Sequence, residues 1–137
     1  MIPKFRVWDK NQQVMRGVKG LFWHKNNLAA HCSPIGNKFD EFFTTILNDG
    51  EYHLMQSTGL VDKNGVQIFE GDVVAIENHP FQKTDDSDVG MEINGNYEVG
   101  WNADDLTWCA GSLLLARVKN YVIVVGNIYE NSDLLEV

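Results

Sequence analysis

The stretch that decides the fold runs from residue 52 to residue 77 and reads YHLMQSTGLVDKNGVQIFEGDVVAIE. Three apolar segments alternate here with two polar turns, at residues 62–65 and 70–72. Asn and Gly tolerate the positive φ that tight turns need, so Asn64-Gly65 marks a reversal of the chain. Short strands joined by tight turns predict a mainly β protein.

The flanking segments extend this pattern. Residues 4–8 alternate as a strand, and short strands are expected at 14–18, at 21–24 and at 121–125, the last β-branched enough to be a buried central strand. Residues 91–99 with Asn94-Gly95 form the strongest hairpin signal. Residues 113–116 are ambiguous, and the flanking strands favour a strand there. We expect a small twisted antiparallel sheet or a partly open SH3-like barrel, α+β at most.

One segment has helical periodicity. Phe39, Phe42, Phe43, Ile46 and Leu47 recur at offsets of three and four, which predicts a short helix near residues 38–48. Asn37 can cap its start and Gly50 follows its end, whereas Thr44 and Thr45 oppose it. Polar turns are expected at 102–105, and a short helical turn at 132–135.

The composition bounds the class of protein. A chain of 137 residues with 44% hydrophobic and 22% charged residues can bury a core without disulfides or metals. Cys32 and Cys109 belong to no Cys-x-x-Cys pair, so we expect both thiols to be reduced and buried. No signal peptide and no apolar run that could span a bilayer are found. We expect one cytoplasmic domain over residues 1–137, with no membrane contact.

The charge is acidic overall but uneven along the chain. Nineteen acidic and eleven basic side chains give a net charge of −8, which repels the phosphate backbone and disfavours nucleic-acid binding. Six of the eleven basic residues nevertheless lie within the first 25 positions. This leaves open a local basic face formed by Lys4, Arg6, Lys10, Arg16 and Lys19.

Three sequence blocks stand at the start, the centre and the end of the chain. They are KFRVWD at 4–9, LMQSTGLVDKNG at 54–65 running into IFEGDVV at 68–74, and VGNIYEN at 125–131. These blocks resemble the YopX family of phage and prophage proteins, and the middle block alone is specific enough to carry the assignment. Ser57 stands where the family usually has an aromatic residue, and Ser132 where it often has proline; neither departure affects the assignment.

The resemblance implies a single YopX-like domain, encoded by a phage or prophage and located in the cytoplasm of a bacterial host cell. It brings no established activity and no cofactor. The residues of the blocks point mainly to structural roles, because Gly59, Gly65, Gly71 and Gly126 suit turns or bulges. Asp62 and Asp72 can cap turns through their carboxylates, and a binding surface is the alternative interpretation of the same set.

No pattern for catalysis or for a metal is found. Asp85, Ser87 and Gly90 match only part of an EF-hand register, and no helices flank them. The potential zinc ligands lack the short paired spacings of structural zinc sites; they are His24, His31, Cys32, His53, His79 and Cys109. Neighbours on a strand face opposite ways, which separates His31 from Cys32. The four tryptophans suit the core and its rim.

We therefore expect a non-catalytic accessory protein that needs no cofactor and binds a phage or host protein or copies of itself. The candidate interaction surface comprises the acidic region 85–105 and the turns at 62–72 and 127–131. Its residues are Asp62, Lys63, Asn64, Asp72, Asp85, Asp86, Asp88, Asn127, Tyr129, Glu130 and Asn131. The alternative is a nucleic-acid-associated role, either DNA binding through the basic N-terminal face or mimicry of nucleic acid by the acidic face.

Overall fold

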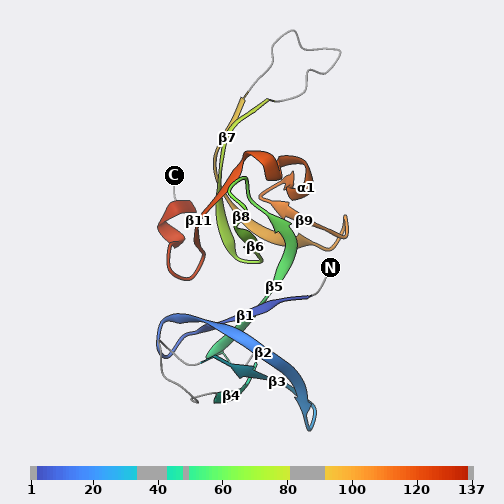
Figure 1. Cartoon of the computed structure of the whole chain (residues 1–137), viewed down its shortest axis with the longest axis vertical. Helices are drawn as coiled ribbons and strands as arrows, with labels where there is room; N and C mark the ends of the chain where they lie inside the picture. Colours follow the sequence, from blue (N-terminus) through green and yellow to red (C-terminus); the bar gives the residue numbers. More distant parts are fainter. Residues whose placement is uncertain (1–2, 34–42, 48–49, 81–91, 136–137) are drawn as a thin grey trace. The chain divides into compact units, whose positions relative to one another are not determined.

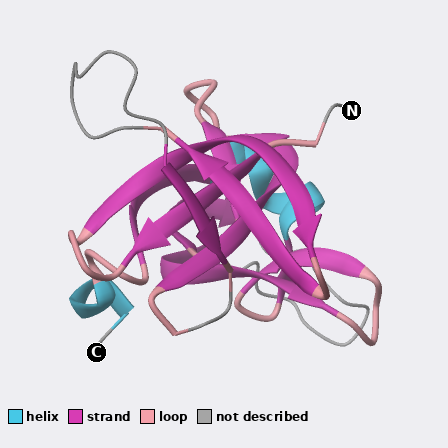
Figure 2. Cartoon of the chain, turned by 90° about the horizontal axis from the view of Figure 1, so that it is seen from below, coloured by secondary structure: helices cyan, strands magenta, loops and turns pink. Residues whose placement is uncertain are grey.

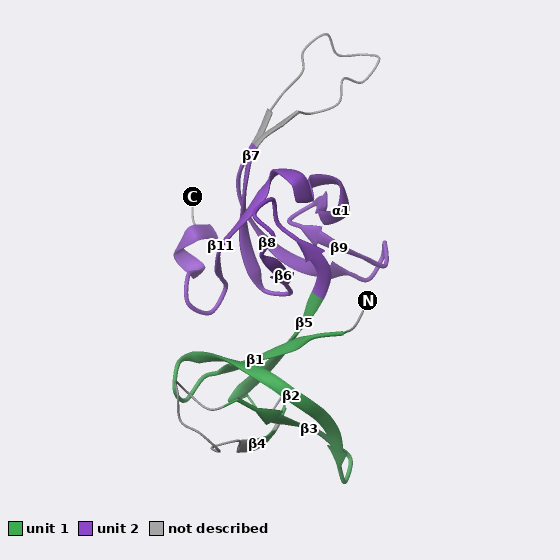
Figure 3. Cartoon of the chain, in the orientation of Figure 1, with its two compact units in different colours: residues 1–57 green, residues 58–137 purple. Residues whose placement is uncertain are grey.

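The chain divides into two compact units. The computed structural model describes residues 3–33, 43–47, 50–80 and 92–135. Unit 1 comprises residues 1–57 and unit 2 comprises residues 58–137, as Figure 3 shows. The sequence predicted one domain over residues 1–137, and strand β5 (Tyr52–Val61) contributes residues to both units.

Unit 1 consists of antiparallel strands around a small core. β1 (Phe5–Asp9), β2 (Val14–His24), β3 (Asn27–Cys32) and β4 (Phe43–Ile46) lie with β5 in the order β4-β3-β2-β1-β5 (Figure 1). Val7, Ala30, Cys32 and Leu47 form the core. Val7, Trp8 and Asp9 are consecutive and all buried, so β1 has buried side chains on both faces.

Unit 2 contains the larger core and the short helical segments. Its elements after β5 are β6 (Gln67–Phe69), β7 (Asp72–Pro80), β8 (Glu92–Asn102), β9 (Thr107–Ala110), β10 (Leu113–Leu114), α1 (Leu115–Val118), η1 (Lys119–Tyr121), β11 (Val122–Asn127) and η2 (Ser132–Leu135). The core centres on Ile68, Val74, Ile76, Val99 and Leu115. Strands make up most of the described chain, as Figure 2 shows.

Both sheets are open. The strand order is β4-β3-β2-β1-β5-β6 in one sheet and β10-β9-β8-β7-β11 in the other, so each sheet has two end strands and, among the described strands, neither sheet closes into a barrel. The prediction of a mainly β fold is confirmed. No helix in the described part of the chain is long and apolar enough to cross a membrane.

The short helix does not lie where the periodicity placed it. Residues 43–46 form β4, so the helix predicted near 38–48 is wrong there; residues 34–42 and 48–49 lie outside the described residues. Thr44, Thr45 and Ile46 are β-branched, and β3 offers them a pairing edge, which favours a strand. The helix is α1, which follows the two-residue strand β10, so the strand predicted over 113–116 is only half correct.

β8 replaces the hairpin predicted around Asn94-Gly95. The chain passes through these residues as one strand, paired with β7 and β9. The favoured Asn-Gly turn needs positive φ at both residues, and only Gly95, with φ +145°, meets this condition. The register of β7 is irregular between Ile76 and His79, opposite this point, so Gly95 accommodates a bulge rather than a turn.

Two other strand predictions differ from the structure. Residues 14–24 form one strand with a register shift between Val18 and Gly20, where two short strands were expected. β11 is an end strand of its sheet rather than a central one, because a β-branched run also suits a strand that is buried on one face. The turns at 62–65 and 102–105, the bulge near Gly126 and the helical turn at 132–135 are confirmed.

Candidate functional site

One buried carboxylate holds the turn at residues 62–65. Asp62 is 4% exposed, and its Oδ1 accepts hydrogen bonds from the backbone N–H groups of Asn64 over 2.8 Å and Val66 over 2.9 Å. Gly65, with φ +84°, donates its N–H to the Asp62 carbonyl over 3.0 Å. The capping role predicted for Asp62 is confirmed.

The same turn covers the free edge of β11. β11 pairs with β7 on one side. On the other side, the Val124 N–H donates to Asp62 Oδ2 over 3.0 Å, and the Val122 carbonyl accepts the Lys63 N–H over 3.0 Å. The carboxylate therefore takes the place of a neighbouring strand's carbonyl and shields the edge from pairing with another chain.

These hydrogen bonds also set the charge of Asp62. Burial tends to raise the pKa of the carboxyl group, but the N–H groups of Val124, Val66 and Asn64, helped by the Lys63 charge, hold the pKa below its usual 3.8. A general acid near neutral pH needs a raised pKa. At neutral pH, Asp62 therefore acts as an ionised hydrogen-bond acceptor rather than as an acid catalyst.

Asp72 and Asn127 close the turns beside two paired strands. They are direct register partners on β7 and β11 and are 2% and 8% exposed. Asp72 Oδ2 accepts the Phe69 N–H over 2.8 Å. Asn127 Oδ1 accepts the N–H groups of Tyr129 over 3.0 Å and Glu130 over 2.9 Å. Both side chains thus hold the scaffold of unit 2.

Asn131 folds back over Gly126. Its Oδ1 accepts the Asn127 N–H over 3.2 Å, and its own N–H donates to the Asn127 carbonyl over 2.9 Å. A Cβ on Gly126 would lie 2.8 Å from Asn131 Cβ, well inside the 3.5–4.0 Å of a favourable carbon contact. The glycine is needed for this close approach.

Some residues of the predicted interaction surface are buried in the scaffold of unit 2, and others are exposed to solvent. Asp62, Asp72 and Asn127 are buried, whereas Lys63, Asn64 and Glu130 are exposed and Tyr129 and Asn131 are half-buried. Asp85, Asp86 and Asp88 lie outside the described residues. Partner contact by the exposed members stays a prediction.

One member of the predicted basic face is engaged inside unit 1. Arg16 is 8% exposed, and its Nε donates to Asp9 Oδ2 over 2.8 Å. A second guanidinium nitrogen donates to the Ser33 carbonyl over 3.1 Å. Lys4, Lys10 and Lys19 remain exposed, so the surface charge of this face is smaller than the sequence suggests.

The two cysteines are free and buried, as expected. His31 is exposed on the opposite face of β3 from Cys32 and stacks on Phe22, with ring centroids 4.8 Å apart. Burial raises the pKa of the Cys32 thiol, more than the nearby Arg16 lowers it, so the nucleophilic thiolate is suppressed. In the part of the chain that the structure describes, no three His, Cys, Asp or Glu side chains are grouped to hold a metal ion.

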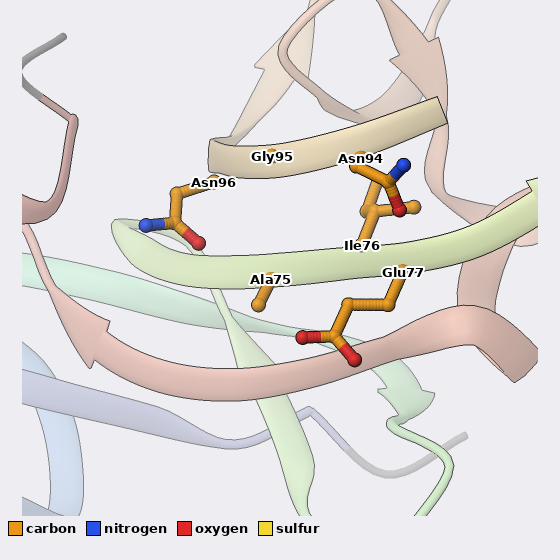
Figure 4. Close-up of a pocket in the computed structure, with 6 residues that line it drawn as sticks. All are labelled: Ala75, Ile76, Glu77, Asn94, Gly95 and Asn96. Atoms are coloured by element: carbon orange, nitrogen blue, oxygen red, sulfur yellow. The ribbon is translucent and has the colours of Figure 1, made fainter. Parts of the chain in front are cut away.

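Two shallow pockets open on unit 2. One, of about 370 Å³, lies between β7 and β8 and is lined by Ala75, Ile76, Glu77, Asn94, Gly95 and Asn96 (Figure 4). Glu77 is the one ionisable side chain of this set, so the pocket offers no acid–base pair. The other, of about 410 Å³, lies beside Gly100, and its lining includes Glu98, Trp101 and Cys109. A Cβ on Gly100 would meet nothing within 4 Å, so the missing side chain leaves this pocket open.

The end of the β8–β9 hairpin exposes apolar side chains beside this second pocket. Trp101 and its register partner Trp108 pack edge to face with centroids 5.2 Å apart, and Trp101 is 49% exposed. In the connecting loop, Leu106 is 73% exposed and has φ +51°, a conformation that bulky side chains rarely adopt. Such strain gathers at binding sites.

Acidic groups surround this hairpin end. Asn102 Oδ1 accepts the N–H groups of Asp104 over 3.0 Å and Asp105 over 3.2 Å, and the Asn102 side-chain amide donates to Asp105 Oδ2 over 3.2 Å. Both aspartates are exposed, as is Glu98 at the Gly100 pocket. The β8–β9 hairpin end therefore combines exposed apolar side chains with exposed carboxylates.

Unit 1 has a second exposed hairpin end, between β2 and β3. Trp23 is 71% exposed there. Lys25 and Asn26 form a two-residue loop between the register partners His24 and Asn27, and Lys25 has φ +55°. Favoured loops of this length need positive φ at the first position and usually place Gly, Asn or Asp there. An exposed tryptophan thus stands beside a cation held in an unfavourable conformation.

The two units carry opposite net charge. Unit 1 has seven basic and five acidic residues, a net charge of +2; unit 2 has four basic and fourteen acidic residues, a net charge of −10. The sequence indicated the charge asymmetry and the acidic 85–105 region, but it did not identify Leu106, Trp23 or Lys25 as candidate site residues. For Leu106 one sequence signal was present, because it is an apolar residue next to a polar turn.

The comparison with protein families identifies the family of this chain. The profile of the family described as YopX protein matches residues 4–136. The chain belongs to the YopX family. It is also similar to protein EF1440 from Enterococcus faecalis, whose crystal structure matches with a TM-score of 0.64 and 30% identity over 99% of each chain. A search of the curated proteins found no match.

Two of the YopX-like blocks meet in unit 2. Asp62 and Lys63, in the central block, bond to Val124 and Val122, which come just before the last block. Gly71 accepts the Ile128 N–H through its carbonyl over 2.9 Å. The residues that carry the YopX resemblance therefore build the scaffold, and the exposed hairpin ends lie outside the quoted blocks.

Proposed function

We propose that this YopX protein is a phage- or prophage-encoded accessory protein that works without catalysis, by binding another protein or by assembling with itself. The observation that carries the proposal is Leu106, which is 73% exposed and held at φ +51°. Exposure of an apolar side chain costs free energy, and a partner that covers Leu106 removes this cost. Backbone strain of this kind gathers at binding sites.

The chemistry of the hairpin end supports a protein as the partner. Tryptophan is enriched at the energetic centres of protein interfaces, where a polar rim surrounds an apolar centre. Trp101 and Leu106 supply the centre, and exposed Asp104 and Asp105 supply part of the rim. The partner surface that fits is cationic around an apolar centre.

The test is a pull-down of tagged protein from host lysate with and without nuclease. A stoichiometric protein that survives nuclease treatment is expected with the wild type and lost with Leu106→Gly, which removes the apolar group and the strain together. Val66→Ser is the matched control, because Val66 is 49% exposed on the turn beside Asp62. Capture retained by Leu106→Gly and lost with Val66→Ser would transfer the role to the turn at 62–72.

A second candidate is a nucleic-acid-associated function. The observation that favours it is the net charge of +2 on unit 1, which also carries the exposed Trp23. Tryptophan stacks on bases, and cationic side chains contact phosphates. Direct binding predicts DNA affinity that falls steeply with added salt; affinity that is absent or independent of salt rules it out.

A further inference from the structure

The two exposed hairpin ends have complementary chemistry. The β2–β3 end combines Trp23, 71% exposed, with the exposed cation Lys25. The β8–β9 end combines the Gly100 pocket and Trp101 with exposed carboxylates. An aromatic side chain flanked by a cation thus exists on the same chain as an open pocket with carboxylates beside it.

We propose that the β2–β3 hairpin end of one copy docks on the β8–β9 hairpin end of a second copy. Trp23 of the first copy occupies the pocket beside Gly100, while Lys25 lies among Glu98, Asp104 and Asp105 of the second. This inference rests on the proposed function and names its partner as another copy of the chain.

Charge selects this pairing over the symmetric alternatives. Unit 1 carries +2 and unit 2 carries −10, so contact between unit 1 of one copy and unit 2 of the next brings opposite charges together. Contact between two copies of unit 2 would oppose like charges. A head-to-tail interface uses different surfaces on the two copies, so the assembly grows into a ring or an open chain.

The pocket suits an aromatic guest. Its volume is about 410 Å³, and among the described residues no atom outside residues 99–101 lies within 4 Å of where a Gly100 side chain would begin. Burying an aromatic side chain removes roughly 150–250 Å² of surface from water. Insertion of Trp23 into the pocket provides this burial.

The experiment is complementation between two variants in sedimentation equilibrium. Trp23→Ala removes the inserted side chain, and Gly100→Leu fills the pocket where the structure has open space. Wild-type protein is expected to form higher assemblies as its concentration rises, and each variant alone to associate about 30-fold more weakly. An equimolar mixture of the two variants is expected to form a one-to-one dimer, because one intact interface remains. Circular dichroism and thermal unfolding establish that each variant is folded.

The symmetric alternatives give different results. If two copies associated through their β2–β3 hairpin ends, the Gly100→Leu variant would still assemble. If they associated through their β8–β9 hairpin ends, the Trp23→Ala variant would still assemble. Either result, or a mixture that stays monomeric, overturns the head-to-tail interface.

Charge exchange tests the polar contacts independently. Lys25→Glu is expected to weaken assembly, and a second copy carrying Asp104→Lys and Asp105→Lys is expected to restore it when mixed with Lys25→Glu. Higher salt should weaken the wild-type assembly. Lys19→Glu is the control for total charge, since Lys19 is exposed on β2 away from the loop.

The outcome separates this inference from the proposed function. Wild-type protein that remains monomeric at about 1 mM, a concentration that populates even weak complexes, overturns self-assembly. If that monomer still captures a nuclease-resistant protein through Leu106, the binding function stands with a different partner.

Discussion

The Asp62 carboxylate and the Val124 backbone N–H are 62 residues apart in the chain and 3.0 Å apart in the structure. Through this bond and the neighbouring one from Lys63 to Val122, a four-residue turn covers the open side of an end strand. One side chain thereby joins the β5–β6 turn to β11, two segments that no local sequence pattern connects.

Removal of the Asp62 carboxylate should destabilise unit 2. Asp62→Ala leaves the N–H groups of Asn64, Val66 and Val124 without their acceptor, and we expect a loss of about 3 kcal/mol in the free energy of unfolding. Urea titration measures the change. Asp133→Ala is the control, because Asp133 is exposed in η2; equal stability of the two variants would contradict the proposed role of Asp62.

The same carboxylate should make stability depend on pH. Its folded-state pKa lies below the usual 3.8, so its contribution is complete above that value and is lost as the pH falls through the lower folded-state pKa. The difference in unfolding free energy between wild type and Asp62→Asn is therefore expected to be constant from pH 7 to about pH 5 and to shrink below pH 4. If this difference in unfolding free energy grew on acidification, the folded-state pKa of Asp62 would be raised rather than lowered.

Two glycines should respond differently to alanine. Gly126→Ala places a Cβ against Asn131 and is expected to cost about 1–3 kcal/mol, whereas Gly100→Ala enters open space and is expected to be neutral or slightly stabilising. Thermal unfolding of both variants checks the contrast. Adding Asn131→Gly should reduce the loss of stability caused by Gly126→Ala. An unchanged loss would show that the steric clash is not with Asn131.

The Asp9–Arg16 pair should be sensitive to substitution of either partner alone. Arg16→Met leaves a buried carboxylate without its 2.8 Å partner and is expected to cost about 3–5 kcal/mol. Lys19→Met, on the same strand but exposed, is expected to change stability by less than about 0.5 kcal/mol. Chemical denaturation of the two variants, compared at one protein concentration, decides between a structural and a surface role for Arg16.

Local chemistry predicted the turns better than the pairing of strands. Asp62 to Gly65 could be assigned because capping and positive φ are properties of single residues. Asn94-Gly95 carries the same signal but lies inside β8, since pairing with β7 and β9 outweighs the turn preference. Likewise, Thr44 and Thr45 pair with β3, a tertiary contact that the helical spacing of the phenylalanines could not reveal.

The candidate site was predictable only in outline. Charge counts identified the acidic region and the basic N-terminus, because charge is a sum over residues. Exposure of Leu106 and Trp23 depends on where each hairpin ends relative to its core, and their surroundings depend on register. For Arg16 the error is the opposite one, since the sequence placed it in an exposed basic face and the structure buries it against Asp9.

The opposite charges of the two units have a practical consequence for handling the protein. A net charge of −8 suggests a molecule that binds anion exchangers and ignores cation exchangers at neutral pH. With +2 on residues 1–57 and −10 on residues 58–137, the whole-chain value describes neither part. Retention on an ion exchanger should depend on which of the two units contacts the resin. Elution position alone is therefore a poor guide to purity or to association state.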